Sequence, residues 1–135
     1  MNKLLDHLSN DIYCRLGVSK INGIGVIAIK DIPIGVDPFK TLSNKKDTII
    51  TLYDEDLVDI DHDVIKIVKD FFGNNGTYDV LYEGPNYINI SYYINHSKKP
   101  NINIVSLAKN EYCNFISNTF IKKGEELTIN YNDYK

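Results

Sequence analysis

The segment Asn95-His96-Ser97-Lys98-Lys99-Pro100-Asn101 decides how this chain is interpreted. Three small polar residues follow the aromatic pair Tyr92-Tyr93, and a proline lies near the end of the segment. Taken alone, such a segment is most simply a hydrogen-bonded turn. His96 and Ser97 lack a Gly-x-Ser-x-Gly elbow, so adjacency alone does not make them a base and its nucleophile. The meaning of the segment therefore depends on what precedes and follows it.

Two further blocks stand in order around this segment. Gly23-Ile-Gly25-Val-Ile-Ala28 comes about 70 residues before it, and Phe120-Ile-Lys-Lys-Gly-Glu-Glu-Leu-Thr-Ile-Asn-Tyr131 ends near the C-terminus. The first block has the letters of a dinucleotide-binding loop, which requires a helix that starts at the glycines. The β-branched run after Gly25 and the nearby Pro33 exclude that helix. A plain turn and a loop whose bare backbone lets a ligand come close both remain open.

The composition is that of one globular domain. The chain has 135 residues and 15.4 kDa, of which 43% are hydrophobic and 24% charged, and this predicts a soluble chain. No window approaches the ~18 apolar residues of a membrane helix, and the N-terminus lacks the pattern of a secretory signal. A net charge of −3 and a pI of about 5.5 predict no direct nucleic-acid binding, which normally requires a basic stripe.

The cysteines and histidines predict no metal site. Cys14 and Cys113 are too few for a disulfide framework and give no ligand spacing, and no histidine is spaced with a cysteine for zinc. A reducing compartment is therefore expected.

The hydrophobic pattern predicts many short strands and one clear helix, an α+β or mostly-β domain. In 61–72 the apolar residues recur at i, i+1, i+3, i+4, i+7 and i+8, which is one wide helical face. The aspartates at its start can accept hydrogen bonds from the free N–H groups of the first turn, and Gly73 is expected to end the helix. Lys109-Asn110-Glu111 is expected to turn a hairpin. Strands are expected over 12–19, 26–29, 48–53, 78–82, 102–108, 112–120 and 127–131.

Six acidic residues fall within 54–63. A calcium loop counted from Asp59 would need Gly at position 64 and Glu at position 70, where Val64 and Asp70 stand, so that loop is excluded. Two interpretations remain open. The acids are a solvated helix start, or they form an acidic rim that attracts a basic peptide.

Taken together and in order, the three blocks resemble the SET domain of protein-lysine methyltransferases. Lys-Gly-Glu-Glu-Leu-Thr-Ile-Asn-Tyr131 is similar to the family's C-terminal motif, and Asn95-His96-Ser97 resembles its Asn-His-Ser motif. Gly23-Ile-Gly25, followed by a Lys-Asp-Ile turn, resembles its opening segment. The match covers roughly 14–134, and the short chain resembles the compact stand-alone SET proteins of some large DNA viruses.

The resemblance implies an α+β, mostly β fold of small curved sheets (a β-clip) with one main helix in an insert. The C-terminal segment would thread beneath a loop as a pseudoknot and bring Asn95 and His96 beside Tyr131. Residues 1–11 would be a tail or a short helix. Residues 12–135 would form a single SET domain with an insert of approximately 36–86.

The resemblance also implies S-adenosylmethionine (SAM) as the methyl donor. The backbone of Asn22-Gly23-Ile24-Gly25 would approach it, Asn95 would bind its methionine end, and main-chain atoms of His96 would meet its adenine. Tyr131 aligns with the family's catalytic tyrosine and would also border the cofactor. It would hold the lysine amine and the methyl group in line and need not act as a base.

Tyr78 is the candidate for a second tyrosine of the lysine channel. Tyrosines suit such a channel because they wrap the aliphatic stem while a hydroxyl steers the amine. Tyr82, Tyr92 and Tyr93 are rivals, and for any single tyrosine ordinary packing is the simpler explanation.

The sequence departs from the family pattern in three places. Lys98 stands where the family often has cysteine, and no cysteine cluster follows Tyr131, so the zinc-binding post-SET region is absent. The channel must then be closed by Tyr134, by residues 36–60 or by a second copy of the chain. Ile129, two residues before Tyr131, leaves the number of methyl groups open.

The function implied is that of a SAM-dependent enzyme that methylates a lysine of a basic protein tail, with a histone as the first expectation. Such a protein would be intracellular, in the nucleus (the host nucleus if the protein is viral) or otherwise in the cytoplasm, with no membrane partner; a homodimer stays open. The alternatives are a SET-like module that binds lysine-rich peptides without turnover, and a methyltransferase of a non-histone protein.

Overall fold

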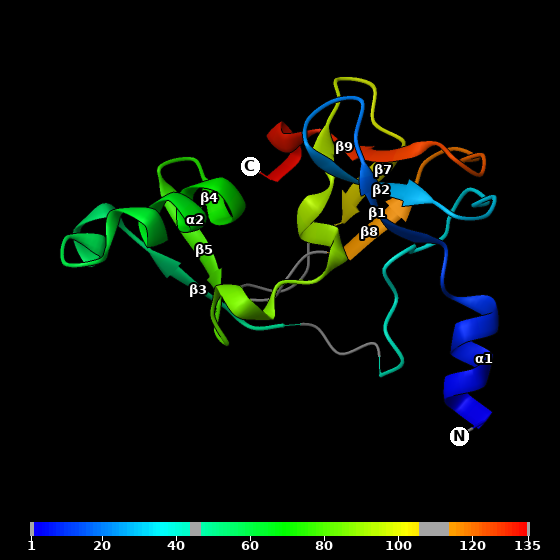
Figure 1. Ribbon diagram of the computed structural model, residues 1–135, viewed down its shortest axis with the longest axis horizontal. Coiled ribbons are helices and arrows are strands. Elements are labelled where there is room, and N and C mark those ends of the chain that lie inside the picture. The colour runs from blue at the N-terminus through cyan, green and yellow to red at the C-terminus, as the bar shows by residue number, and fades with distance from the viewer. Residues whose placement is uncertain (1, 44–46, 106–113, 135) are drawn as a thin grey trace.

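The computed structural model describes residues 2–43, 47–105 and 114–134, and shows a mixed α+β chain dominated by short strands (Figure 1). The helices are α1 (Asn2–Asn10) and α2 (His62–Phe72). The strands are β1 (Cys14–Val18), β2 (Ile24–Ala28), β3 (Ile49–Leu52), β4 (Gly73–Asn74), β5 (Thr77–Leu81), β6 (Asn95–His96), β7 (Ile102–Val105), β8 (Asn114–Ser117) and β9 (Glu126–Ile129). Short 3-10 turns are η1 (Asp54–Leu57), η2 (Pro85–Tyr87), η3 (Ile90–Tyr93) and η4 (Tyr131–Tyr134).

The strands form several small sheets, as expected. One sheet has the order β1-β2-β9-β6, a second the order β3-β5-β4, and β7 pairs with β8. Strand β9 pairs antiparallel with β2 and parallel with β6. The glycine block (residues 23–28), the Asn-His-Ser block (residues 95–97) and the closing block (residues 120–131) therefore lie on three neighbouring strands of one sheet, β2, β6 and β9.

Two hydrophobic clusters divide the chain into a body and an insert lobe, which we define as residues 47–89. The body cluster contains the completely buried residues Val26, Ile32, Ile102, Ile121, Leu127 and Ile129. Complete burial of such a side chain stabilises the fold by about 1.5–3 kcal/mol. The cluster of the insert lobe contains Leu57, Val68, Phe72, Tyr78, Val80 and Leu81. The lobe projects from the body at the left of Figure 1.

Turn η3 connects the two clusters. The Tyr92 ring packs edge-on against Phe72, with ring centroids 5.4 Å apart. The Tyr93 ring packs in the same way against Phe71, at 5.5 Å, while it also packs on the body cluster. Since β6 begins two residues after Tyr93, this packing positions the Asn-His-Ser block relative to the insert lobe.

The predicted helix is confirmed as α2. The Asp61 carboxylate accepts a hydrogen bond of 2.9 Å from the Asp63 backbone N–H, so Asp61 caps its first turn. Glycine ends the helix because a side chain at this position would come close to the backbone of the preceding turn. Gly73 has an extended backbone (φ −62°), and a Cβ there would lie 3.0 Å from the Lys69 carbonyl oxygen.

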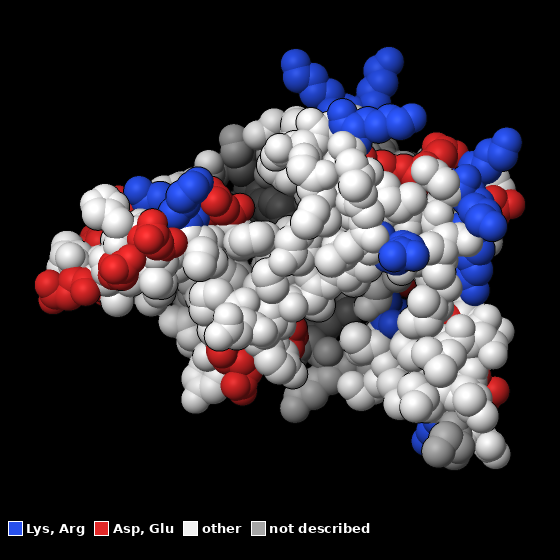
Figure 2. All heavy atoms as spheres, viewed as in Figure 1, with Lys and Arg blue, Asp and Glu red and all other residues white. Residues whose placement is uncertain are grey.

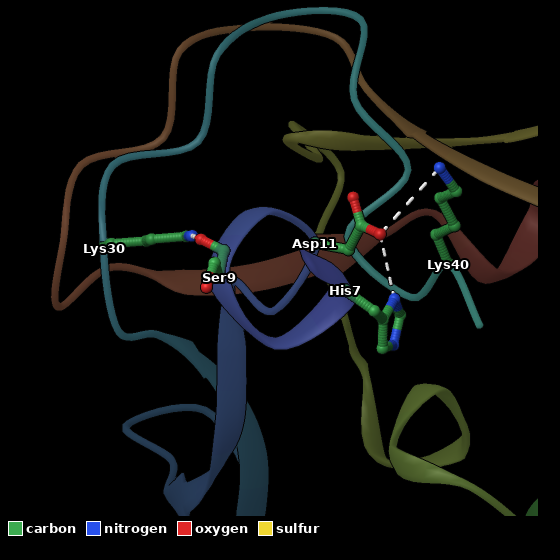
Figure 3. Close-up of polar contacts among 5 residues, drawn as sticks. All are labelled: His7, Ser9, Asp11, Lys30 and Lys40. Carbon is green, nitrogen blue, oxygen red and sulfur yellow. Dashed lines mark hydrogen bonds and ion pairs between the residues drawn. The ribbon is translucent and has the colours of Figure 1, made fainter. Parts of the chain in front are cut away.

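The N-terminal residues form a helix, one of the two outcomes that the sequence allowed. Helix α1 has no buried residue, and polar contacts hold it against the body (Figure 3). Asp11 accepts a hydrogen bond of 2.9 Å from His7 and lies 3.9 Å from the Lys40 ammonium group. The Lys30 ammonium group donates to the Ser9 carbonyl oxygen at 3.4 Å.

The expected strands are found, but β8 ends at Ser117 and β9 at Ile129, so that Tyr131 lies in η4 and not in a strand. The two-residue strands β4 and β6 were not expected. Strands β7 and β8 form the predicted hairpin, whose turn at 109–111 lies outside the described residues. Cys113 lies outside them as well, whereas Cys14 is buried as a free thiol. Within the described ranges, neither helix has the length and apolar character needed to cross a bilayer.

Candidate functional site

The side-chain amide of Asn95 is the centre of a buried polar cluster. Asn95 is 7% exposed, and its amide nitrogen lies within 3.3 Å of four acceptors. These acceptors are the Ser19 hydroxyl at 3.0 Å, the Asn22 carbonyl at 3.1 Å, the Ile24 carbonyl at 3.3 Å and the Glu126 carboxylate at 2.9 Å. An amide nitrogen has only two hydrogens, so the acceptors outnumber the donors.

Ser19 and Glu126 fix the loop that precedes β2. The Ser19 hydroxyl donates to the Glu126 carboxylate at 2.8 Å and accepts from the backbone N–H groups of Ile21 and Asn22. The Ser19 backbone N–H also donates to the Gly23 carbonyl oxygen at 2.8 Å. A tight loop thus presents its Asn22 and Ile24 carbonyl oxygens to Asn95.

Gly25 is glycine because the cluster leaves no room for a side chain. A Cβ at Gly25 would lie 2.5 Å from a Glu126 carboxylate oxygen and 3.1 Å from the Asn95 amide nitrogen. Gly23 has a different requirement, since its φ of +52° lies in the left-handed region and a Cβ there would meet open space. Of the two interpretations of this block, the structure favours a close backbone approach at Gly25.

His96 and Tyr131 contact each other across the β6–β9 pair. The Tyr131 backbone N–H donates to Nδ1 of His96 at 3.0 Å, so this nitrogen is unprotonated in the contact. The two ring centroids are 5.1 Å apart. The expected proximity of Asn95 and His96 to Tyr131 is therefore present.

The Tyr131 hydroxyl points at the backbone directly before Asn95. It donates a hydrogen bond of 2.8 Å to the Ile94 carbonyl oxygen, while the residue as a whole is 48% exposed. Partial burial, and then the negative charge of Glu126, raise the pKa of Tyr131 above its ordinary value. The phenol thus remains a neutral hydrogen-bond donor at neutral pH.

The cluster is suited to a positively charged ligand group. The Asn22 and Ile24 carbonyls and the Glu126 carboxylate present oxygen acceptors around the Asn95 amide, which has only two hydrogens, whereas the Ser19 hydroxyl is already bonded to Ile21, Asn22 and Glu126. An ammonium group brings three donors and a charge that Glu126 complements. The methionine end of SAM carries such a group, so the residues fit this cofactor chemically.

Tyr78 lies in the insert lobe. Its ring belongs to the cluster around Phe72, and its hydroxyl donates to the Asp54 carboxylate at 2.7 Å. This hydrogen bond, with burial and the Asp54 charge, raises the pKa of Tyr78. These contacts belong to the lobe itself. A role in a lysine channel stays a prediction, and the rivals Tyr92 and Tyr93 pack against α2.

Sequence reasoning missed Ser19 and Glu126 as site residues. Glu126 lies in the quoted closing block, and Ser19 is followed by a turn-forming Asn-Gly pair. Asn101 has a supporting role, because its amide donates to the Glu126 carbonyl oxygen and accepts from the Thr128 backbone N–H. Among the residues that the structure describes, no group of three His, Cys, Asp or Glu side chains could hold a metal ion.

Comparison with known proteins identifies the family. The chain matches the family model of the SET domain over residues 23–132. A Plasmodium falciparum protein of known crystal structure, described as a candidate histone methyltransferase, matches with a TM-score of 0.53 and 16% identity, covering 89% of this chain and 93% of that chain. At this identity the similarity shows the fold alone. A search of curated proteins gave no match.

The sequence match and the site agree. The family model spans the glycine loop, the Asn-His-Ser segment and the closing block, and these are the parts that meet around Asn95 and Tyr131. The chain therefore belongs to the SET domain family, the family of SAM-dependent protein-lysine methyltransferases.

Proposed function

We propose that this protein transfers a methyl group from SAM to the side-chain amine of a lysine in a basic protein tail. One observation carries the proposal. The Tyr131 hydroxyl is bound to the Ile94 carbonyl oxygen, and the next residue, Asn95, is the centre of an acceptor-rich cluster suited to the methionine end of SAM. A candidate catalytic group and a candidate cofactor pocket thus share one backbone segment.

Asn22, Gly23, Ile24 and Gly25 would hold the cofactor through backbone atoms, together with Asn95 and His96. Glu126 and Ser19 would complete the pocket, because their oxygens already surround the Asn95 amide. When bound, SAM supplies an activated methyl group on a positively charged sulfur. The chain itself contributes the alignment of the two reactants and the exclusion of water.

Tyr131 would align the lysine amine. Only the neutral amine attacks, and its unperturbed pKa is about 10.4, so a channel that disfavours charge assists the reaction. A phenol that stays protonated can hold the amine by a hydrogen bond without removing a proton from it. Tyr131 would therefore be a catalytic positioning group, and Tyr78 is proposed as a second wall of the channel.

The substrate is proposed to be a histone. Its support is the fold shared with the Plasmodium protein described as a candidate histone methyltransferase, together with the acidic character of the insert lobe, whose residues 54–63 contain six acids. A histone substrate would place the protein in the nucleus. The channel would be closed by residues 36–60 or by a second copy of the chain; the third candidate, the Tyr134 side chain, lies outside the described residues.

The test is incubation of the protein with labelled SAM and a panel of core histones, followed by mass spectrometry of the modified lysine. Label on a histone lysine supports the proposal. Label that appears only when non-histone basic proteins are added in place of the histones would make a non-histone protein the substrate. Saturable peptide binding without transfer would instead favour a binding module.

A further inference from the structure

A hollow of about 500 Å³ lies at one end of the insert lobe, apart from the residues assigned to SAM. Its walls come from described residues on either side of 44–46, from the end of β5, and from η2 and the residue Asn89 after it. The lining residues are Thr41, Ser43, Asp47, Thr48, Leu81, Tyr82, Glu83, Tyr87 and Asn89. This volume is within the range of typical ligand sites, roughly 300–1,000 Å³.

The hollow combines two carboxylates with two exposed aromatic rings. In the described part of the chain, neither the Asp47 nor the Glu83 side chain has a hydrogen bond or an ion pair. Tyr82 and Tyr87 are 70% and 56% exposed. Carboxylates attract a cation, and aromatic faces bind cations too, a guanidinium group more often than an ammonium group.

The charge of the whole lobe favours a cation as well. Residues 47–89 contain ten acidic residues and two lysines, a net charge of −8, while the rest of the chain has a net charge of +5. Figure 2 shows this division, with acidic side chains over the insert lobe and most basic side chains over the opposite part of the molecule. The resulting field draws basic groups toward the lobe.

The hollow is connected to the proposed reaction centre by η3. Asn89 lines the hollow, and its side chain accepts from the Ser91 backbone N–H at the start of η3. At the other end of η3, the Ile94 carbonyl oxygen accepts from Tyr131. A 3-10 helix rises about 2 Å per residue, so this step of five residues spans about 10 Å.

We propose that this hollow binds a second basic side chain of the protein substrate, arginine in the first place. An extended tail covers about 3.3 Å per residue, so this side chain lies at least about three residues from the methylated lysine. The proposal rests on the proposed function for the identity of the substrate. It adds a site that makes the enzyme select a pair of basic residues instead of a single lysine.

The experiment compares peptides that carry one lysine and, three to six residues away, either arginine, lysine or the neutral isostere citrulline. Affinity is measured by fluorescence anisotropy in the presence of S-adenosylhomocysteine, so that no turnover is needed. We expect the arginine peptide to bind about fivefold more tightly than the citrulline peptide, with lysine between them. The double variant Asp47→Asn/Glu83→Gln should lose this preference, and Tyr82→Ala/Tyr87→Ala should weaken it.

The matched control is Asp59→Asn/Asp63→Asn, which removes the same charge from exposed residues of the same lobe outside the hollow. Retention of the arginine preference in this control supports a site. Equal affinity of the native protein for arginine and citrulline peptides, or equal loss in both carboxylate variants, overturns the proposal. If the protein transfers methyl groups but shows no arginine preference, the arginine site is refuted and the proposed function stands. If it prefers arginine peptides but transfers no methyl group to any peptide, the proposed function is refuted and the arginine site stands.

Discussion

The Tyr131 hydroxyl donates a hydrogen bond of 2.8 Å to the Ile94 carbonyl oxygen, 37 positions earlier in the chain. The parallel pairing of β6 with β9 makes this contact possible, because it aligns Asn95 with Thr128 and His96 with Ile129. The hydroxyl is thus oriented by a backbone atom, while the ring lies against the His96 ring. The proposed catalytic group is for this reason hydrogen-bonded to the residue that precedes Asn95 in the proposed cofactor pocket.

Replacement of Tyr131 by phenylalanine should abolish the alignment of the lysine amine and leave the cofactor pocket around Asn95 intact. We expect kcat to fall by about 100-fold or more, the scale of loss for one positioned donor, while the Kd for SAM changes less than about threefold. Single-turnover transfer and calorimetric SAM titration measure the two effects. Tyr13→Phe is the control, because its ring retains the contact with Lys30. Full activity of Tyr131→Phe would refute the role assigned to Tyr131.

Asn95→Ala should damage both stability and cofactor binding. Its amide serves acceptors from Ser19, Asn22, Ile24 and Glu126, and buried acceptors left without a partner cost about 1–3 kcal/mol. Each kcal/mol corresponds to a Tm decrease of roughly 4 °C for a domain of this size. Thermal unfolding with and without SAM measures both effects. Asn86→Ala, at an exposed position, should change neither, and an unchanged Tm for Asn95→Ala would argue against the buried cluster.

Gly25→Ala and Gly23→Ala should fail for different reasons. The new methyl at Gly25 would push into Glu126 and Asn95, so we expect SAM affinity to fall at least about tenfold. At Gly23 the cost is backbone strain at φ +52°, about 1 kcal/mol of stability, with SAM affinity reduced less. SAM titration and urea unfolding separate the two. If Gly23→Ala lost more affinity than Gly25→Ala, the close approach at Gly25 would not be the reason for glycine there.

The buried thiol of Cys14 should make the protein lose stability at alkaline pH. Burial, and then the charge of Asp37, raise the pKa of the Cys14 thiol from 9.0 to about 12. The unfolded chain therefore releases a proton above pH 9 that the native chain still binds. By linkage, the stability that Cys14 contributes falls by about 1.4 kcal/mol per pH unit between pH 9 and 12. Urea unfolding of the native chain and of Cys14→Ala should show a shallower pH dependence in the variant, and parallel curves would contradict the burial of the thiol.

Tyr78 and Asp54 can be tested as a pair. Tyr78→Phe removes the donor of their 2.7 Å hydrogen bond, and Asp54→Asn changes its acceptor. If Tyr78 lines the lysine channel, we expect Tyr78→Phe to lower kcat several-fold more than Asp54→Asn does, at similar Tm. The measurement is transfer at saturating peptide. Equal kcat in both variants would leave Tyr78 as a member of the lobe's core.

Local pattern was sufficient for the elements with strong periodicity. The apolar face of residues 64–72 predicted α2 because it repeats at the period of a helix. The β-branched run after Gly25 predicted a strand and excluded a dinucleotide-binding helix, as β2 shows. The conformation of residues 1–11 could not be decided in this way, because α1 has no buried residue and is held by a contact of Ser9 with Lys30 and by the bond of His7 to Asp11, which lies beside Lys40.

The family could be predicted without a structure, because three motifs stand in the order that is typical of SET domains, and the family model matches residues 23–132. The hydrogen bond between Ser19 and Glu126, 107 positions apart, and its place beside the Asn95 amide could be found only in the folded chain. Periodicity reports which face of one element is buried, whereas the meeting of Ser19, Asn95 and Glu126 depends on how β9 pairs with β2 and β6, a long-range choice that no local pattern encodes.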